Sequence, residues 1–546
     1  MSVDTDNAAF QDALNLIQYT RQSVFLTGKA GTGKSTFLRY VCEHTKKKYV
    51  VLAPTGIAAI NAGGSTMHSF FKLPFYPLLP DDPNLSLQRG RIHEFFKYTK
   101  PHRKLLEQIE LIIIDEISMV RADIIDAIDR ILRVYSHNLR EPFGGKQLLL
   151  VGDVFQLEPV VKNDEREILN RFYPTPYFFS ARVFGQIDLV SIELQKVYRQ
   201  TDPVFVGVLD HIRTNTAGAA DLQLLNTRYG SQIEESEADM YITLATRRDT
   251  VDSINEKKLA ELPGESITFE GVIEGDFPES SLPTSQELVL KPGAQIIFIK
   301  NDFDRRWVNG TIGVIAGIDE EEETIYVITD DGKECDVKRD SWRNIRYRYN
   351  EKTKEIEEEV LGSFTQYPIR LAWAITVHKS QGLTFSRVVI DFTGGVFAGG
   401  QAYVALSRCT SLDGIQLKKP INRADIFVRP EIVNFAGRFN NRQAIDKALK
   451  QAQADVQYAA AARAFNKGDM EECLEQFFRA IHSRYDIEKP VPRRLIRRKL
   501  GIINTLKEQN KKLKEQMREQ QERLRQYAHE YLLMGNECIT QAHDIR

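Results

Sequence analysis

The sequence predicts an α/β protein with two parallel-sheet domains, a small β-barrel inserted into the second domain, and an all-helical C-terminal extension. Short β-branched runs alternate with helical stretches from Ser23 to about Leu194, and a second set of such runs follows. No strand-like run follows about Gly437, which predicts the helical extension. With 546 residues, of which 42% are hydrophobic, the chain can form several cores. The expected domains are 1–195, then 196–291 with 367–437, the barrel at 292–366 and the extension at 438–546.

The first domain contains four predicted strands, and their carboxyl ends identify the functional edge of its sheet. The strands are the runs Val24–Leu26, Val50–Ala53, Leu111–Ile114 and Leu148–Val151. Small, polar or acidic residues come after them, namely Gly28, Pro54, Asp115 and Gly152. Open parallel sheets bind ligands at this edge, so we expect the chemistry of the domain there.

The second domain is predicted to be interrupted. Its α/β pattern at Ile242–Thr246 and Ile254–Leu262 resumes only at Leu371–His378 and Val388–Phe392. Between these segments, short strand-like runs and a hairpin turn at residues 330–332 predict a small β-barrel. The runs are Gln295–Ile299, Gly310–Ile315 and Ile325–Ile328.

The helical extension contains two patterns. From Tyr458 to Ile481 the small and aromatic residues resemble one tetratricopeptide-like hairpin, although such repeats need neighbours on which to stack. After the prolines at 490 and 492, a heptad seam with polar interruptions runs through positions 503, 506, 510, 513, 517, 520, 524, 527 and 531. The seam predicts self-association or docking onto another protein. The excess of Lys and Arg in 489–525 fits either contact with duplex DNA or a solvated helix face.

Composition narrows the class of protein. No apolar run approaches the roughly 20 residues that span a bilayer, so no membrane partner is expected. Met1–Phe10 carries two Asp and no Lys or Arg, unlike a secretory or transit signal, and the five cysteines are scattered. We therefore expect a cytoplasmic protein, associated with the nucleoid if the cell is bacterial. Lys and Arg total 73 against 75 acidic residues, so any basic surface for nucleic acid must be local.

A complete phosphate-binding loop follows the first strand. Its glycines let backbone N–H groups face phosphates, and the next helix adds its N-terminal dipole. Lys34 would reach the β and γ phosphates of ATP, and the Ser35 hydroxyl would hold Mg²⁺. The predicted nucleotide-binding residues of the loop are Gly28, Ala30, Gly31, Thr32, Gly33, Lys34, Ser35 and Thr36.

Asp115 and Glu116 extend the prediction from nucleotide binding to hydrolysis. They follow a neighbouring buried strand, where Asp115 can bind magnesium through water and Glu116 can polarise the attacking water. The alternative is an N-cap pair before a helix that starts near Ser118.

Three further side chains are candidates for the γ phosphate. Gln156 follows the fourth strand and could contact both the phosphate and the attacking water, although a loop Gln is otherwise solvated. Arg199 and Arg408 could reach the same phosphate from across a cleft and stabilise charge during phosphoryl transfer. A structural ion pair is the alternative for either arginine.

Taken in order, the motifs resemble the Pif-type family of superfamily-one helicases, which is related to RecD. The matching segments are 28–36, 53–59, 115–119, 152–157, 372–382 and 402–408. Residues 66–70 and 142–147 resemble marks of this family in particular. The resemblance covers about Gly28 to Thr410, and one departure is Glu158, where relatives commonly have proline.

The resemblance implies a DNA helicase that uses ATP and Mg²⁺, translocates 5′ to 3′ on single-stranded DNA, and unwinds duplex or structured DNA in replication, recombination or repair. Two RecA-like domains would carry the motor, while an SH3-like barrel and a wedge at about 63–75 would steer the strands. It also implies that Gln11 reads the adenine and that Gln381 and Gly382 lie beside the nucleotide.

The track for single-stranded DNA is expected to draw on both domains and the barrel. A non-specific tracker needs phosphate contacts and stacking surfaces rather than base-edge readers. Residues that resemble family contact positions, together with two barrel residues, are Pro54, Thr55, Thr66, His68, Thr246, Arg247, Thr376, His378 and Lys379, with Asn309 and Thr311. Trp307 serves either this track or the local core. The wedge would use Phe70, Phe71 and Phe75, which core packing explains equally well.

Two other functions fit parts of the sequence. An RNA-directed or purely translocating ATPase would carry the same motifs, and only comparison of DNA and RNA stimulation with strand displacement separates these readings. A nucleotide-gated scaffold with a silent motor is disfavoured, because the whole catalytic set is present in the sequence.

Overall fold

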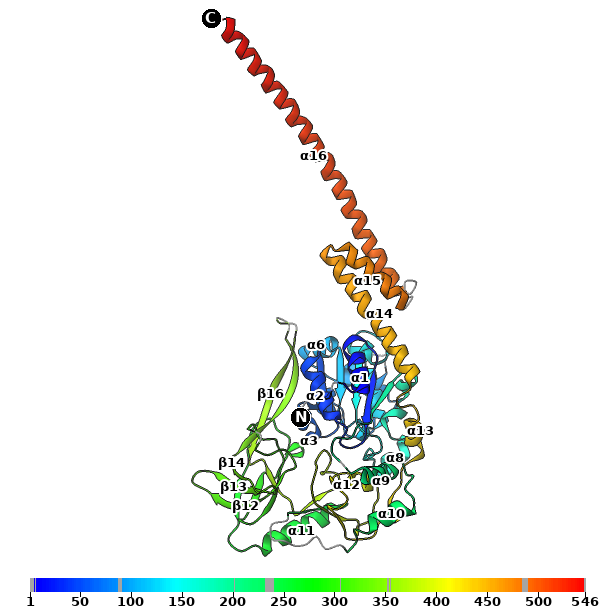
Figure 1. Cartoon of the computed structure of the whole chain (residues 1–546), viewed down its shortest axis with the longest axis vertical. Helices are drawn as coiled ribbons and strands as arrows, with labels where there is room; N and C mark the ends of the chain where they lie inside the picture. Colours follow the sequence, from blue (N-terminus) through cyan, green and yellow to red (C-terminus); the bar gives the residue numbers. More distant parts are fainter. Residues whose placement is uncertain are drawn as a thin grey trace. The chain divides into compact units, whose positions relative to one another are not determined.

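The computed structural model describes residues 4, 6–86, 91–200, 202–230, 240–304, 306–350, 353, 355–483 and 490–544. It divides into two compact units, Met1–Ala452 and Gln453–Arg546. The first unit contains the α/β domains and the inserted strands, and the described part of the second is helical (Figure 1). The α/β class predicted from the sequence is confirmed.

A six-stranded parallel sheet organises the N-terminal domain, with strand order β3-β2-β4-β5-β1-β6. The strands are β1 (Val24–Gly28), β2 (Tyr49–Ala53), β3 (Ser65–Thr66), β4 (Leu111–Ile114), β5 (Gln147–Val151) and β6 (Val190–Leu194). All four predicted runs are confirmed as strands. Their side chains are almost wholly buried because helices cover both faces of the sheet.

Successive residues of these strands enter different cores. On one face, α1 (Ala8–Tyr19) and α2 (Lys34–His44) pack over Leu26, Ile113 and other residues of the sheet. On the other face, α6 (Lys100–Gln108) and α7 (Ala122–Tyr135) pack over the strand residues that alternate with those of the first face. The period-two alternation of a strand therefore builds two cores from one run of β-branched residues.

The second parallel sheet is assembled from distant segments, in the order β18-β7-β19-β20. Its strands are β7 (Ile242–Ala245), β18 (Ala374–Thr376), β19 (Val388–Asp391) and β20 (Ile415–Leu417). Because β7 lies between β18 and β19, the chain leaves this sheet and returns to it. The helices of this domain are α9 (Pro203–Arg213), α10 (Ala219–Asn226), α11 (Arg248–Glu261) and α12 (Gln401–Leu406). The predicted segment that begins at Ile254 lies in α11.

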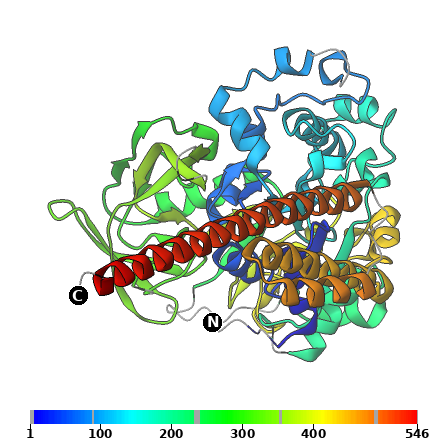
Figure 2. The ribbon, with the colours of Figure 1, turned by 90° about the horizontal axis from the view of Figure 1, so that it is seen from above.

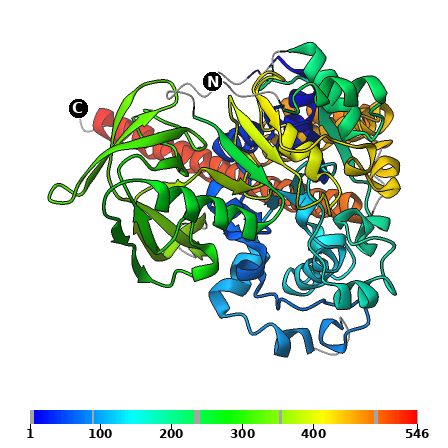
Figure 3. The ribbon, with the colours of Figure 1, turned by 90° about the horizontal axis from the view of Figure 1, so that it is seen from below.

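The inserted strands form three antiparallel sheets. The five-stranded sheet contains β14, β13, β12, β11 and β17, the second pairs β10 with β8, and the third contains β15, β16 and β9. The bounds are β8 (Ile267–Glu270), β9 (Val272–Gly275), β10 (Glu287–Leu290), β11 (Gln295–Phe298), β12 (Ile312–Asp319), β13 (Thr324–Thr329), β14 (Glu334–Val337), β15 (Asp340–Asn350), β16 (Glu355–Gln366) and β17 (Ile369–Leu371). In Figure 3 these strands gather with α11 in green.

This β region differs from the barrel predicted from the sequence in two respects. It begins at Ile267 rather than 292, because β9 pairs with β16 and β10 with β8. The long β15–β16 hairpin was not expected. Its Tyr347 is buried in the core of the first domain, and its hydroxyl accepts a hydrogen bond from the Val51 N–H at 3.3 Å. Trp307 belongs to the local core, where its ring stacks on Phe298 at 4.4 Å.

Shorter elements complete the first unit. The remaining helices are α3 (Gly56–Asn61), α4 (Met67–Phe71), α5 (Arg91–Phe95), α8 (Asn163–Leu169) and α13 (Pro430–Ala436). The 3-10 helices are η1 (Pro83–Leu85), η2 (Ile117–Met119), η3 (Pro142–Gly145), η4 (Phe178–Ser180), η5 (Arg182–Gly185), η6 (Glu279–Ser281) and η7 (Arg423–Asp425).

The expected wedge contains β3 and α4. Phe70 and Phe71 are buried in the core, so packing explains these two residues. Phe75 is 83% exposed and stacks on His68 at 5.0 Å between ring centroids. Of the three phenylalanines only Phe75 is exposed, and its role in strand separation stays a prediction.

The helical extension contains α14 (Arg442–Lys467), α15 (Met470–Ser483) and α16 (Pro490–Asp544). The boundary between the compact units falls inside α14, after Ala452. Gly468, with a φ of +85°, allows the turn between α14 and α15, and the Tyr458 and Phe477 rings lie 6.0 Å apart across this hairpin. Figure 2 shows α16 as one uninterrupted helix. No helix in the described ranges is long and apolar enough to cross a membrane.

Candidate nucleotide site and nucleic-acid track

The phosphate loop connects β1 to the N-terminus of α2. Gly31 and Gly33 have φ values of +79° and +88°, which side-chain-bearing residues rarely adopt. The Lys34 ammonium donates hydrogen bonds to the carbonyls of Gly28 at 2.7 Å and Lys29 at 2.9 Å. Burial lowers the pKa of Lys34, while Asp153 and Glu116 oppose that change. The lysine is therefore held over the loop where phosphates would bind.

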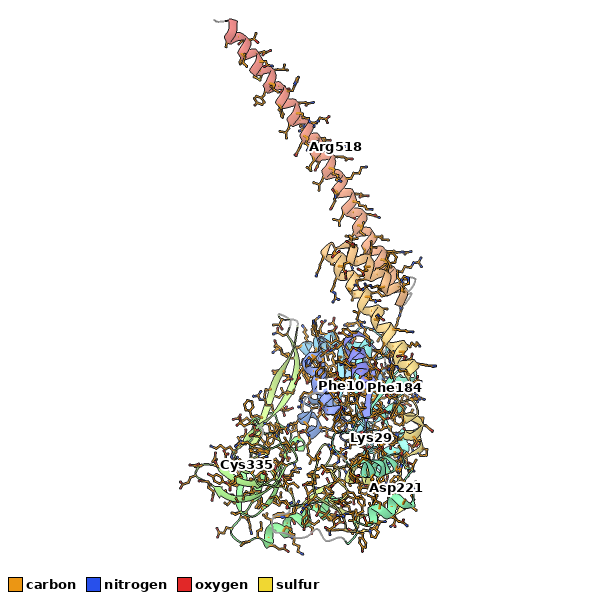
Figure 4. The ribbon with its side chains drawn as sticks, viewed as in Figure 1. Phe10, Lys29, Phe184, Asp221, Cys335 and Arg518 are labelled. Atoms are coloured by element: carbon orange, nitrogen blue, oxygen red, sulfur yellow. The ribbon has the colours of Figure 1, made fainter. Side chains whose placement is uncertain are left out.

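The loop is also tied to the second α/β domain. The Ala30 N–H donates to the Tyr403 hydroxyl at 3.0 Å, and Lys29, labelled in Figure 4, forms an ion pair with Asp210 of α9. The two domains therefore meet at the residues that would surround a nucleotide.

Asp115 and Glu116 lie at the carboxyl end of β4, as predicted. The Glu116 N–H donates to the Asp115 carboxylate at 2.9 Å, and Glu116 has a left-handed φ of +50°. Although Glu116 precedes η2, its side chain makes no capping hydrogen bond, which argues against the N-cap alternative. Burial raises the pKa of both carboxyls; that of Glu116 rises to about 7 with a further contribution from Asp115, and Lys34 opposes it.

Gln156 follows β5 and is 8% exposed, so it is not a solvated loop residue. Its amide lies 3.4 Å from the Asp153 carboxylate. Asp153 in turn forms a buried ion pair with Arg213 of α9 at 3.1 Å, and Arg213 also contacts Glu193 at 2.9 Å. Arg213 was missed by the sequence analysis because no local motif marks it.

Arg199 and Arg408 are held by backbone carbonyls. Arg408 is 1% exposed and donates to the carbonyls of Val404 at 3.0 Å and Ser380 at 3.3 Å, while Arg199 donates to the Ser407 carbonyl at 3.3 Å. Burial lowers the pKa of both guanidiniums, that of Arg408 to about 9. Neither arginine forms an ion pair within the described ranges, which argues against the structural alternative.

One cavity of about 530 Å³ brings five of the six catalytic candidates together, and the sixth, Asp115, lines the neighbouring cavity described below. Its wall contains the loop from Ala30 to Thr36 and the side chains of Glu116, Gln156, Arg199 and Arg408. Asn7, Phe10, Leu194 and Tyr198 also line it and were not predicted from the sequence. These residues carry no motif, since they come from α1, β6 and the segment after β6.

A second cavity of about 600 Å³ contains part of the expected DNA track. Thr55, Asn309, His378 and Lys379 line it, so both α/β domains and the β insertion contribute. Burial, together with the nearby Arg370 and Arg248, lowers the pKa of Lys379 to about 8. Arg370 and Trp342 line the same cavity and were not predicted.

The other expected DNA contacts lie outside this wall. Thr66 caps α4 through its hydroxyl, which accepts from the Ser69 N–H at 3.2 Å, and the Thr376 hydroxyl accepts from the Lys379 N–H at 3.2 Å. Thr311 accepts from the Val308 N–H at 3.2 Å. Pro54, His68, Thr246 and Arg247 also do not line the cavity. Their roles in DNA binding stay predictions.

The residues expected at the adenine and beside the nucleotide do not all line the nucleotide cavity. Gly382 lines both cavities, whereas Gln381 lines only the second, and Gln11 lines neither. The backbone N–H of Gln11 donates to the Asn7 carbonyl at 3.0 Å, so Gln11 lies one turn after Asn7 and next to Phe10, two residues that do line the nucleotide cavity. The adenine role of Gln11 stays a prediction.

The residues present fit a magnesium ion. Ser35, Asp115 and Glu116 all line the second cavity, and hydroxyl and carboxylate oxygens are the donors that Mg²⁺ takes. Burial raises the pKa of both adjacent carboxyls, and the cations that oppose this rise are Lys34 and, for Glu116, also Arg408.

Glu158 has a defined structural partner. Its carboxylate accepts from the Arg429 guanidinium at 2.6 Å and from the Tyr177 hydroxyl at 3.1 Å. The loop after Gln156 is therefore fixed by an ion pair between Glu158 and Arg429.

Comparison with known proteins identifies relatives along most of the chain. A family model described as PIF1-like helicase matches residues 4–207. ATP-dependent DNA helicase Pif1 of Campylobacter jejuni is 34% identical over 72% of this chain and 88% of its own length. ATP-dependent DNA helicase PIF1 of Emericella nidulans is 32% identical over 76% of this chain, which spans only 60% of that longer relative.

Solved structures agree with these relatives. Bacteroides sp Pif1 in complex with ADP-AlF4 is 42% identical, with a TM-score of 0.73 over 80% of this chain and 97% of that chain. Pif1 helicase from Candida albicans is 28% identical, with a TM-score of 0.60 over 80% of this chain and 99% of that chain.

The fold and the site define a P-loop ATPase in which two parallel-sheet domains face each other across a nucleotide cleft. The chain belongs to the family of PIF1-like helicases, whose named relatives are ATP-dependent DNA helicases. The family expected from the ordered motifs is confirmed.

Proposed function

We propose that this chain hydrolyses ATP to move 5′ to 3′ along single-stranded DNA, and so separates duplex or structured DNA ahead of it. The observation that carries the proposal is a shared wall. Ser35, Glu116 and Gly382 line both the 530 Å³ nucleotide cavity and the 600 Å³ cavity of the expected DNA track. A change at the γ phosphate therefore acts directly on residues that border the strand.

The proposed hydrolysis uses residues from both sides of the cleft. Lys34 neutralises the β and γ phosphates, and Ser35 and Asp115 would hold a magnesium ion, which would supply further charge neutralisation. Glu116 accepts the proton of the attacking water, and Gln156 orients that water. Arg199 and Arg408 stabilise the charge that develops on the transferred phosphate.

Domain closure would assemble this site. Arg408 belongs to the segment after α12, while Lys34 and Glu116 belong to the first sheet. ATP binding favours the closed arrangement, and loss of the γ phosphate releases it, which advances one domain along the strand. The proposed track residues Thr55 and Lys379 lie on different domains and are therefore displaced relative to each other in each cycle.

The decisive experiment measures unwinding of two duplexes that differ only in having a 5′ or a 3′ single-stranded tail. We expect displacement from the 5′-tailed substrate alone, with Mg²⁺ and ATP present. Glu116→Gln is the matched inactive control, because it retains the shape of the side chain and removes the base. Equal displacement from both tails would overturn the proposed polarity.

ATPase stimulation by DNA and by RNA of the same base composition tests the alternative of an RNA-directed motor. Stimulation by RNA alone would indicate an RNA-directed motor. Stimulation by DNA without strand displacement would indicate a purely translocating ATPase. We further propose that the protein acts where its DNA substrate lies. In a bacterial cell this place is the nucleoid, in the cytoplasm.

A further inference from the structure

The last helix, α16, carries an apolar seam without a partner in the described chain. Leu506, Leu513, Met517 and Leu524 are 58%, 60%, 60% and 65% exposed. Figure 4 shows the side chains of α16 around Arg518 projecting from the helix on every side. Exposure of a regular row of large apolar residues indicates that this helix pairs with another element.

The seam has the geometry of a two-stranded coiled coil. In a heptad numbered a to g, Ile503, Asn510, Met517 and Leu524 take position a, and Leu506, Leu513 and Gln520 take position d. The pattern continues with Tyr527, Tyr531, Met534 and Cys538 at alternating d and a positions. The residues from 503 to 538 span ~54 Å of helix at 1.5 Å per residue.

We propose that the partner is a second copy of this chain, paired through α16 as a parallel, in-register coiled coil. Asn510 supplies the first argument. A lone Asn at position a specifies register and a two-stranded state, because it needs another polar group in the same layer. In a parallel pair without stagger, position a faces position a, so each Asn510 meets the other.

The flanking charges supply the second argument. In the parallel pair, position g faces position e of the next heptad of the other helix, which brings Gln509 opposite Lys514 and Arg523 opposite Ala528, with no like charges opposed. In an antiparallel pair position a faces position d, and the one amide that the seam offers Asn510 at position d is Gln520. That arrangement brings the two Lys514 side chains together at its centre, which is unfavourable.

The outer face is suited to water. Glu508, Glu515 and Glu522 stand three residues before Lys511, Arg518 and Arg525, a spacing that places opposite charges side by side on one helix. These residues take positions f and b, away from the seam. The charged residues therefore stabilise each helix without opposing the pairing.

The test measures the mass of the full chain by analytical ultracentrifugation. We expect a mass of two chains for the wild type and of one chain for Leu524→Glu. Leu532→Glu is the matched control: Leu532 is also 65% exposed on α16 but lies outside the seam, so this variant should remain dimeric. Circular dichroism verifies that both variants remain helical. A single-chain mass for the wild type, or a dimeric Leu524→Glu variant, would overturn the proposal.

Cys538 reports the direction of pairing. It is exposed and takes position a, so the two thiols lie in one layer only when the helices are parallel and in register. A short bis-maleimide should then join two chains of the wild type and fail to join the Cys538→Ser variant, which stays dimeric by mass. A dimer that the reagent does not join, or a mass above two chains, would contradict the parallel pair.

Discussion

The ionised carboxyl of Glu116 serves as the proposed base for hydrolysis, and it also lowers the stability of the folded protein. The Glu116→Gln variant tests both effects. Burial and the Asp115 carboxylate raise the pKa of Glu116 from 4.5 to about 7. Keeping this group ionised in the folded protein therefore costs ~3 kcal/mol, from 1.36 kcal/mol for each pKa unit. Because the folded pKa is the higher one, the cost is absent below pH 4.5, grows as the pH rises to about 7, and is complete above it.

Glu116→Gln removes that cost and also removes the base. We expect the variant to match the wild type in stability near pH 4.5 and to exceed it by up to ~3 kcal/mol at pH 8, in the absence of nucleotide. Hydrolysis should fall by at least ~10²-fold, as for the loss of a general base. Nucleotide and DNA binding should persist.

The assay is hydrogen exchange followed by mass spectrometry in peptides that contain β4, corrected for the intrinsic effect of pH. A difference of ~3 kcal/mol corresponds to about a hundredfold slower exchange through unfolding. Glu110→Gln is the control, since Glu110 is an exposed carboxylate at the opposite end of the same strand. Equal protection at both pH values, or substantial residual DNA-stimulated turnover, would refute the role of Glu116.

Three further predictions concern the second domain, the wedge and the track. Arg199→Ala should retain ATP binding and lower DNA-stimulated hydrolysis by ~10³-fold, as for loss of an arginine that stabilises phosphoryl transfer; unchanged turnover would exclude that role. Phe75→Ala should lower strand displacement while changing stability by less than ~0.5 kcal/mol, because Phe75 is 83% exposed. Its contrast is the buried Phe71→Ala, which should cost ~3–5 kcal/mol in unfolding free energy. Affinity for single-stranded DNA should fall as the pH rises through about 8, where Lys379 loses its charge. Lys379→Ala should show less of this dependence and lower the slope of log affinity against log salt by ~0.7, and an unchanged slope would remove Lys379 from the phosphate contacts.

The parts of the site that the sequence predicted are those with a local cause. A strand that is followed by a glycine-rich loop and the start of a helix places Lys34 and Ser35 at the carboxyl edge of the sheet. A buried strand that ends in two acidic residues places Asp115 and Glu116 at the same edge. Most strands of the two parallel sheets were predictable for the same reason, since their runs are apolar on both faces, whereas β3, β6 and β20 were not named from the sequence.

The parts that escaped depend on residues far apart in the sequence. Arg213 meets Asp153 from α9, and Tyr403 meets Ala30 from the other domain, and neither pair has a spacing that a pattern would show. The β15–β16 hairpin escaped because it is rich in arginines and glutamates, which resembles a solvated segment. Its buried aromatic residues, Trp342, Tyr347 and Phe364, are few and widely spaced.

The place of β7 in the second sheet has a consequence for how the chain folds during synthesis. β7 is the central strand between β18 and β19, but both of those neighbours are translated only after the whole β insertion. The first sheet is complete at Leu194 and can fold as soon as it emerges. β7 stays an unpaired apolar strand until Thr376 of β18 has been made, and it gains its second neighbour only when β19 is complete at Asp391. The whole antiparallel insertion is synthesised in the interval. Variants that slow the insertion should therefore prolong exposure of β7 and reveal themselves as aggregation of nascent chains, with the finished protein unaltered.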